Sequence, residues 1–190
     1  NSSGYKILHL GTHAEANDMD PLQSRLFFAR PLETTTSADD GSLYAYEIYS
    51  MQLRAGLAVL TACETGAGAA HSGEGVMSLA HSFMFAGCPS VVMSLWKIDE
   101  KTSAQIITDF YKYLRKGHPK SEALRKAKRR FINNNHGELT NPFYWAGVCI
   151  IGDDSPLYEG TGRWYWILGA GIAVVVILFF FGKRLGGNRM

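Results

Sequence analysis

The sequence predicts an α/β domain with a mostly parallel sheet and helices on both of its faces. Four short apolar runs, at residues 5–10, 57–62, 91–95 and 145–151, have the continuous hydrophobic character of strands that are buried on both sides. Between these runs lie segments with apolar residues at helical spacing. Strands that alternate with helices are typical of parallel sheets, because each parallel connection must cross a face of the sheet.

Three helices are expected from their spacing and end signals. The first covers residues 75–86 and ends at Gly87, the second covers residues 102–115 and ends near Gly117, and the third begins at Pro119. Glycine is favoured just after helices and proline in their first turn. Each segment repeats apolar residues every three to four positions, so each has one face to bury.

Residues 11–50 contrast with this pattern because they are polar and rich in turn-forming pairs. We interpret them as a long loop, with a short hairpin around residues 26–30 and a helix around residues 43–52. The basic residues of the third predicted helix mostly fall off its apolar face, and we interpret them as a solvated surface. The net charge of +2 is too small to indicate a nucleic-acid partner.

The number and spacing of the cysteines argue against three kinds of site. There are three, an odd number at irregular spacing, so no disulfide framework can use them all. None belongs to a CxxC pair, which argues against a zinc knuckle or a redox dithiol. Cys88 and Cys149 lie in apolar surroundings, where we expect them to be small buried hydrophobic residues.

An apolar run without any charged residue, WYWILGAGIAVVVILFFF, covers residues 164–181. A helix of this length rises about 1.5 Å per residue and spans roughly 27 Å, close to the hydrocarbon thickness of a bilayer. Aromatic residues crowd its first end and basic residues follow its second. We therefore expect a transmembrane helix over residues 164–182 and a short basic tail over residues 183–190. The alternative, a buried core helix, rarely stays apolar on every face over such a length.

The position of the domain relative to the membrane stays open. The basic tail favours a cytoplasmic C-terminus, which places residues 1–160 in a periplasm-like space. The Lys- and Arg-rich segment 112–130 favours the opposite, because it could rest against an anionic cytoplasmic leaflet. We expect a domain over residues 1–152 and a linker over residues 153–163. Because the first residues, Asn1 to Gly4, contain neither an initiator Met nor a signal-peptide pattern and an apolar run follows almost at once, we expect the chain to be part of a longer protein.

Two reactive side chains follow predicted strands. His13 lies three residues after the run 5–10, and Cys63 directly follows the run 57–62. The carboxyl ends of parallel strands share one edge of a sheet, where α/β proteins place their sites. An imidazole beside a thiol can take its proton, which produces the nucleophilic thiolate, and can return that proton to a leaving group. We therefore expect His13 and Cys63 to react as a pair, with backbone amides of the two loops stabilising an oxyanion.

Several short motifs follow one another along the chain. They are HLGTHA around His13, LTACETGAG around Cys63, SLWKID from Ser94 and PFYWAG from Pro142. In this order they resemble the CHAT family of caspase-like peptidases over residues 5–152. The resemblance implies a caspase- or separase-type fold, a protein substrate, and tetratricopeptide repeats upstream in the same protein. It also implies more sheet ahead of the first strand, so the N-terminal part of the domain is expected to be missing.

The resemblance assigns catalytic roles residue by residue. It implies that His13 is the general base and Cys63 the nucleophile of a cysteine endopeptidase. The amides of Ala14 and Cys63 are implied in the oxyanion hole. Related enzymes often have glycine at the position of Ala14, and glycine eases a close backbone approach.

The resemblance also implies a pocket for the side chain that precedes the cut. Thr61, Trp96 and Asp99 lie where such enzymes build this pocket. Asp99 could select a basic substrate side chain there, or it could cap the helix that begins near Thr102. Both roles stay open.

Three other functions compete with that of a peptidase. A metal hydrolase would use the residues that most resemble ligands, namely His9, His13, Glu15, His71 and His81. They do not form an HExxH motif, and a core histidine is the expected role of His9 inside its strand. A phosphate-binding loop fails because no Lys-Ser/Thr pair follows the glycines of residues 66–75. The main alternative is a catalytically silent caspase-like scaffold that signals from the membrane through partners. No cofactor and no metal are implied.

Overall fold

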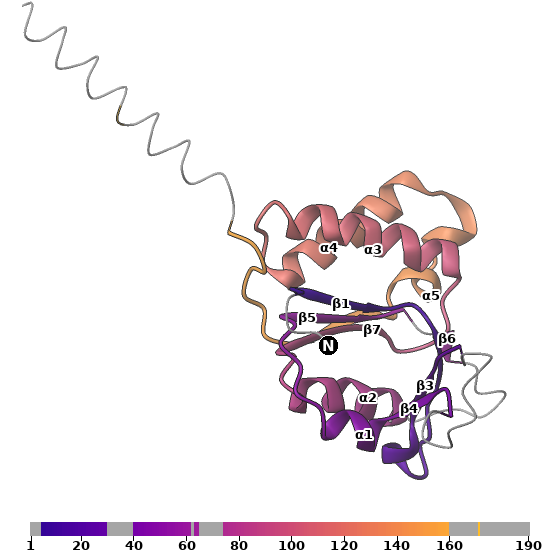
Figure 1. Cartoon of the computed structure of the whole chain (residues 1–190). Helices are drawn as coiled ribbons and strands as arrows, with labels where there is room; N and C mark the ends of the chain where they lie inside the picture. Colours follow the sequence, from indigo (N-terminus) through magenta and orange to yellow (C-terminus); the bar gives the residue numbers. More distant parts are fainter. Residues whose placement is uncertain (1–4, 30–39, 62, 65–73, 160–170, 172–190) are drawn as a thin grey trace, which may run out of the picture.

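A computed structural model describes residues 5–29, 40–61, 63–64, 74–159 and 171. In this part of the chain a sheet lies between two helical layers, one on each face (Figure 1). The predicted α/β class with helices on both faces is therefore confirmed, and this arrangement is compatible with a caspase-like fold.

The main sheet contains the four predicted strands. They are β1 (Ile7–Leu10), β5 (Leu57–Leu60), β7 (Ser90–Ser94) and β8 (Val148–Gly152), in the order β1-β5-β7-β8. The first three strands run parallel, and β8 is antiparallel to β7. Their continuous apolar character follows from burial on both faces: all four residues of β5 are buried.

Four helices cover the main sheet. On one face lie α1 (Ala45–Tyr49) and α2 (Glu74–Phe85), and on the other lie α3 (Glu100–Leu114) and α4 (Lys120–Asn134) (Figure 1). The predicted spacing holds for α2, α3 and α4, with ends that differ by one or two residues. Pro119 is the N-cap of α4.

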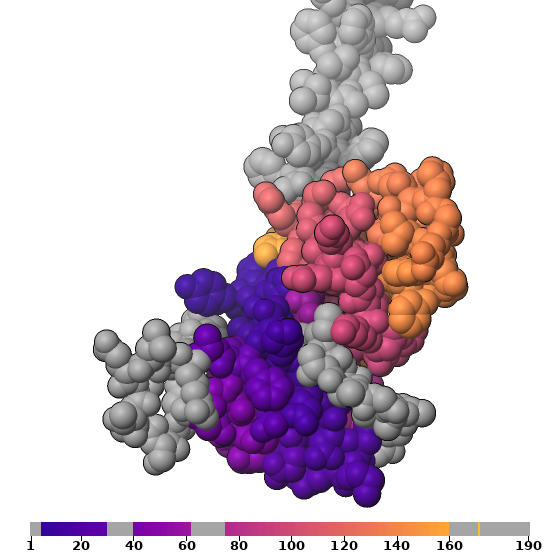
Figure 2. Space-filling model, turned by 90° about the vertical axis from the view of Figure 1, so that its right-hand side faces the viewer, coloured from indigo at the N-terminus to yellow at the C-terminus, as the bar shows by residue number. Residues whose placement is uncertain are grey.

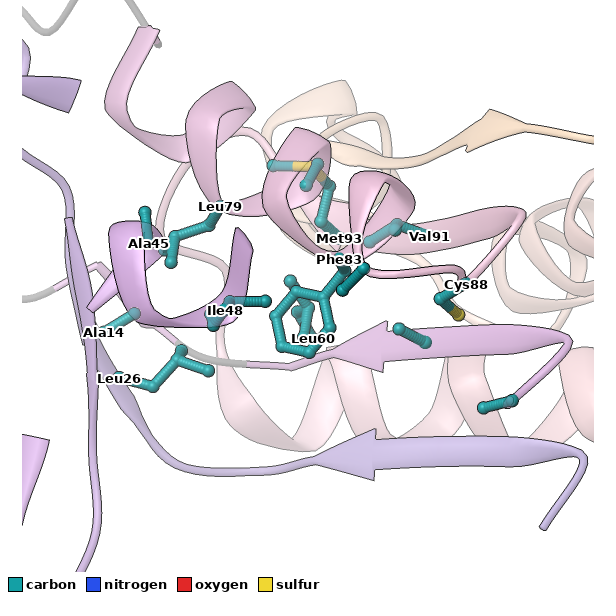
Figure 3. Packing of buried hydrophobic residues seen from close by; sticks show 14 residues of the cluster. Ala14, Leu26, Ala45, Ile48, Leu60, Leu79, Phe83, Cys88, Val91 and Met93 are labelled. Carbon is teal, nitrogen blue, oxygen red and sulfur yellow. The ribbon is translucent and has the colours of Figure 1, made fainter. Parts of the chain in front are cut away.

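The two faces of the sheet have separate cores. Ala58 of β5 and Val91 of β7 pack with α2 residues such as Phe83, which is 2% exposed. The next residues along the same strands, Val59 and Val92, pack with α3 and α4 instead. This alternation is the two-residue period of a strand. Figure 3 shows the first core, with Phe83 among side chains from both sheets of the molecule.

The prediction of a long loop over residues 11–50 is wrong, because this region forms most of a second sheet, but the helix predicted around residues 43–52 is confirmed by α1. Its strands are β2 (His13–Glu15), β3 (Arg25–Phe27), β4 (Ser42–Tyr44) and β6 (Cys63–Glu64), in the order β4-β3-β2-β6. Among the described strands of this second sheet only β2 and β6 pair in parallel, so the prediction of a mostly parallel sheet holds for the main sheet alone. Strands of two or three residues are too short to show an alternating pattern.

Local contacts explain how this polar region is held. Leu26 at the centre of β3 is fully buried in the first core. The Arg25 guanidinium donates to the Glu15 carboxylate at 2.7 Å across the β2–β3 pair. The Glu47 side chain caps the start of α1, where it accepts from the Tyr44 amide at 2.8 Å. A single-turn 3₁₀ helix, Pro21–Gln23, connects β2 to β3.

The expected strand over residues 145–151 begins later than predicted. Pro142–Trp145 forms the short helix α5, in which the Asn141 side chain accepts from the Phe143 amide, and a 3₁₀ turn, Gly137–Thr140, precedes it. The aromatic residues of α5 therefore belong to a capped helical turn, and the ladder of β8 starts at Val148.

The predicted membrane segment lies outside the described residues, apart from Gly171. Among the residues that the structure describes, no helix combines the length and apolar character needed to cross a bilayer. The first part of the predicted linker is described, and it packs on the start of α4. The buried Lys120 ammonium lies 2.8 Å from Asp153 and lowers the pKa of that carboxyl group to about 2, while the Ser121 amide donates to Asp154 at 2.6 Å.

Candidate active site at the exits of β1 and β5

The exits of β1 and β5 are joined by backbone contacts. The Thr61 amide, directly after β5, donates to the Leu10 carbonyl at the end of β1 at 3.1 Å. The next residue, Gly11, lies close to the Thr61 side chain: a Cβ atom there would be 3.3 Å from the Thr61 hydroxyl oxygen. The segments that follow β1 and β5 therefore leave the main sheet from one closely packed junction.

The same two segments pair again in the second sheet. There His13 of β2 and Cys63 of β6 are Cα partners in a parallel ladder. In the main sheet Leu10 is the partner of Leu60, so each residue pairs with the one fifty positions later in both sheets. Neighbouring strands lie about 4.8 Å apart. The backbone thus places the two residues predicted as base and nucleophile side by side.

His13 lies at the start of β2 with an exposed side chain. On its other side it is the Cα partner of Phe27 in β3, and the neighbouring Thr12 hydroxyl donates to the Phe27 carbonyl. Ala14 is 7% exposed, with Leu26 and Glu64 as its partners on the two flanking strands. The oxyanion role of the Ala14 and Cys63 amides stays a prediction.

A cleft of about 430 Å³ opens beside His13. One wall comes from the exits of β1 and β5, including His9, Gly11 and Thr61. The other wall is a single stripe of α3 at helical spacing, formed by Glu100, Ser103, Ala104, Ile107, Thr108 and Tyr111. Figure 2 shows the face on which the N-terminal segment, in indigo, meets the helical layer of α3 and α4, in rose.

His9 lies in this cleft, whereas the sequence favoured a core position for it. Its imidazole bridges two hydroxyl groups: Nδ1 lies 3.0 Å from the Tyr111 hydroxyl and Nε2 lies 3.1 Å from the Thr61 hydroxyl. Desolvation lowers the pKa of His9, and burial raises the pKa of Tyr111 to about 12. Both groups are therefore neutral at pH 7. Sequence reasoning missed Tyr111 and Glu100, although the stripe of α3 has a regular helical spacing.

The structure brings together two of the three residues predicted for the substrate pocket. Thr61 lines the cleft with His13 and also lines a second, smaller cavity with Trp96, whereas Asp99 lines neither. The Trp96 indole N–H donates to the Phe143 carbonyl at 2.8 Å, and its ring packs against Gly147. The Asp99 carboxylate accepts from the Thr102 amide at 3.0 Å and so caps α3, which is the second of its two expected roles.

The surroundings of the Cys88 and Cys149 thiols differ from those of a nucleophilic cysteine. Cys88 is fully buried and Cys149 is partly buried, and desolvation raises the pKa of both thiols. A raised pKa keeps a thiol protonated and unreactive. Within the described ranges, no group of three or more His, Cys, Asp or Glu side chains is arranged to hold a metal ion.

Sequence comparisons place these motifs in a known family. Residues 1–153 match the CHAT domain. Tetratricopeptide repeat protein 28 from Homo sapiens is 28% identical over 158 residues, which cover 74% of this chain and 6% of that protein. The Mus musculus protein of the same name is 27% identical over 115 residues, 60% of this chain and 5% of that protein. The chain thus matches only a small part of these relatives. Because the family match covers most of its 190 residues, the chain belongs to the CHAT domain family.

Proposed function

We propose that this chain is the catalytic part of a caspase-like cysteine endopeptidase that uses His13 and Cys63. The observation that carries the proposal is the pairing of these two residues as Cα partners in adjacent parallel strands. Membership of the CHAT family, which is related to caspase-like peptidases, supports the same reaction class. The exposed position of His13 beside a cleft supports access for a polypeptide.

The proposed reaction has two halves. His13 takes the proton from the Cys63 thiol, and the thiolate forms a bond to the carbonyl carbon of the scissile peptide. The C–N bond then breaks as His13 gives its proton to the leaving amine. Water, deprotonated by His13, hydrolyses the acyl-enzyme and frees the thiol. We assign the amides of Ala14 and Cys63 to the oxyanion of each tetrahedral intermediate.

The cleft beside His13 is the proposed site for a substrate side chain next to the scissile bond. Its volume of about 430 Å³ is enough for any single side chain. Hydroxyl groups and imidazoles line it, and among the described residues of its lining Glu100 is the carboxylate while Lys and Arg are absent. This lining favours a side chain that donates hydrogen bonds or carries positive charge.

We further propose that the chain acts within a longer protein at a membrane. The names of the two relatives support tetratricopeptide repeats elsewhere in that protein. The apolar run of residues 164–181 supports an anchor over residues 164–182. Alkaline extraction of membranes tests the anchor: the full-length protein should stay in the pellet, and a variant with Val175→Lys and Ile177→Lys should be released.

Cleavage is tested with the full-length parent protein, its Cys63→Ala variant and a Cys149→Ala control. Each is incubated with a complex peptide library, and new peptide termini are identified by mass spectrometry. The proposal predicts cleavage by the wild-type protein and the control at a common residue, and none by Cys63→Ala. Cleavage that persists in Cys63→Ala would contradict the assignment of Cys63 as the nucleophile. Absence of cleavage in all three proteins, with partners added, would favour the scaffold function instead.

A further inference from the structure

Three side chains form a hydrogen-bonded chain that the proposed reaction does not use. Tyr111 of α3 contacts His9 of β1, and His9 contacts Thr61 at the exit of β5. The three residues are far apart in sequence, and Tyr111 lies 102 positions from His9. The Tyr111 and His9 rings also meet edge to face, with centroids 5.8 Å apart. We refer to these residues as the Tyr111–His9–Thr61 chain.

Both hydrogen bonds can form at once with His9 in its neutral form. A neutral imidazole has one N–H donor and one nitrogen acceptor, and each hydroxyl group can either donate or accept. One nitrogen of His9 therefore donates to one hydroxyl while the other nitrogen accepts from the second. Desolvation lowers the pKa of His9 and so favours this neutral form.

One end of the chain is fixed to a rigid part of the fold. Tyr111 follows Phe110, which is fully buried in the core between α3 and the main sheet, and Ile107 one turn earlier is 4% exposed. Helix α3 therefore cannot shift relative to the sheet without opening that core. The Tyr111 hydroxyl is a fixed point from which His9 is oriented.

The other end of the chain lies at the junction of the two exits. The Thr61 amide donates a hydrogen bond to the Leu10 carbonyl, and the Thr61 hydroxyl oxygen would be 3.3 Å from a Cβ atom at Gly11. Thr61 also lies two positions before Cys63 in the sequence. The exit that leaves Leu10 reaches His13 after three residues. A rotation of the Thr61 side chain would therefore disturb both exits at their common origin.

We propose that His9 is a positioning residue. It contacts Tyr111 with one ring nitrogen and Thr61 with the other, and so holds the Thr61 side chain in place and fixes the junction from which His13 and Cys63 extend. The inference rests on the proposed peptidase function, because it assigns His9 a role in aligning that pair. A misalignment of about 1 Å between reacting groups can lower a rate by about a hundredfold. Small losses of alignment should therefore lower kcat while the cleft still binds substrate.

The test uses the full-length protein and a peptide that Cys63-dependent cleavage has identified. Tyr111→Phe and Thr61→Val each remove one hydroxyl group with little change of shape, and each should lower kcat about tenfold. KM should change less than kcat, although both side chains also line the cleft. Thr61→Ser restores the hydroxyl group and should return kcat to within about twofold of wild type. Tyr113→Phe, on the same helix outside the cleft, is the matched control.

The outcomes separate this inference from the proposed function. Unchanged kcat in Tyr111→Phe and Thr61→Val, with cleavage that still depends on Cys63, would overturn the positioning role and leave the peptidase intact. A change in KM alone would also overturn it, since His9 would then act in substrate binding. If Thr61→Ser were as impaired as Thr61→Val, the hydroxyl group would not be the relevant feature. Thermal unfolding of each variant identifies any loss that comes from misfolding.

Discussion

His13 and Cys63 are Cα partners in the parallel pair of β2 and β6, with the same offset of fifty residues that relates Ile7 to Leu57 in the main sheet. The register is kept because the exits from β1 and β5 contain the same number of residues before the second sheet begins. The two segments that leave β1 and β5 have equal lengths and are joined by the hydrogen bond from the Thr61 amide to the Leu10 carbonyl. They therefore bring two residues from distant parts of the sequence to adjacent positions.

Substitution of Gly11 by Ala should disturb this junction. The added Cβ atom would lie 3.3 Å from the Thr61 hydroxyl oxygen, so Thr61 must move by a few tenths of an ångström. We expect kcat to fall by about three- to tenfold, while the free energy of unfolding changes by less than about 1 kcal/mol. Steady-state kinetics and urea unfolding measure the two effects. A large loss of stability with normal kcat would contradict the assignment.

Gly147→Ala should have the opposite profile. A Cβ atom at Gly147 would lie 2.7 Å from the Trp96 ring, which is held by its hydrogen bond to the Phe143 carbonyl. Overpacking of this kind costs about 1–3 kcal/mol. Urea unfolding should show that loss, and kcat at a temperature where the variant is folded should stay near wild type. Unchanged stability would mean that the Trp96 ring can move aside.

The charge of Glu100 should influence which side chain is accepted in the cleft. In Glu100→Gln, the ratio of kcat/KM for a substrate with Lys or Arg to that for its uncharged analogue should fall about two- to fivefold, as expected for an exposed ion pair of up to about 1 kcal/mol. Asp99→Asn is the matched control, because asparagine keeps the cap on α3 while removing the neighbouring charge. A larger effect of Asp99→Asn would return the selecting role to Asp99.

Protonation of His9 should destabilise the fold in acid. Desolvation lowers the pKa of His9 below its ordinary value of 6.5, so the unfolded chain binds more protons than the folded one around and below that pH. The contribution of His9 to stability is therefore present above pH 6.5 and decreases as the pH falls toward the pKa of the folded state. His9→Gln should remove part of this slope in urea unfolding measured from pH 7.5 to 5. If the free energy of unfolding of His9→Gln depended on pH as steeply as that of wild type, the predicted contribution of His9 would be contradicted.

The Lys120–Asp153 ion pair should hold the start of the linker on the domain. The Lys120 side chain is 3% exposed, so Asp153→Ala would leave a buried cation without its carboxylate partner. We expect this variant to be less stable than wild type, and the double variant Lys120→Met/Asp153→Ala to recover part of the loss. The pKa of Asp153 is lowered from the ordinary aspartate value of 3.8 to about 2, so the contribution of the ion pair to stability should be lost in strong acid, as the pH falls from 3.8 toward about 2. A double variant less stable than Asp153→Ala would contradict this account.

The sequence was informative where burial is continuous. Strands such as β5 are apolar at each position because both faces are covered, and α2 to α4 show helical spacing because each buries one face against the sheet. The second sheet was missed because its strands have two or three residues and pair over long distances. The adjacency of His13 and Cys63 could be predicted because each follows one of two strands of the main sheet. The roles of His9, Tyr111 and Glu100 depend on how α3 packs across the sheet, which no local pattern reveals.

The pairing of His13 with Cys63 is tested most directly by the rate at which iodoacetamide alkylates Cys63 as a function of pH. Peptide mapping by mass spectrometry separates Cys63 from Cys88 and Cys149, whose raised pKa values should keep them slow. We predict that Cys63 in the full-length protein reacts well below its ordinary pKa of about 8.5, and that His13→Ala moves its profile up to about that value. Identical profiles in the two proteins would contradict a His13–Cys63 pair.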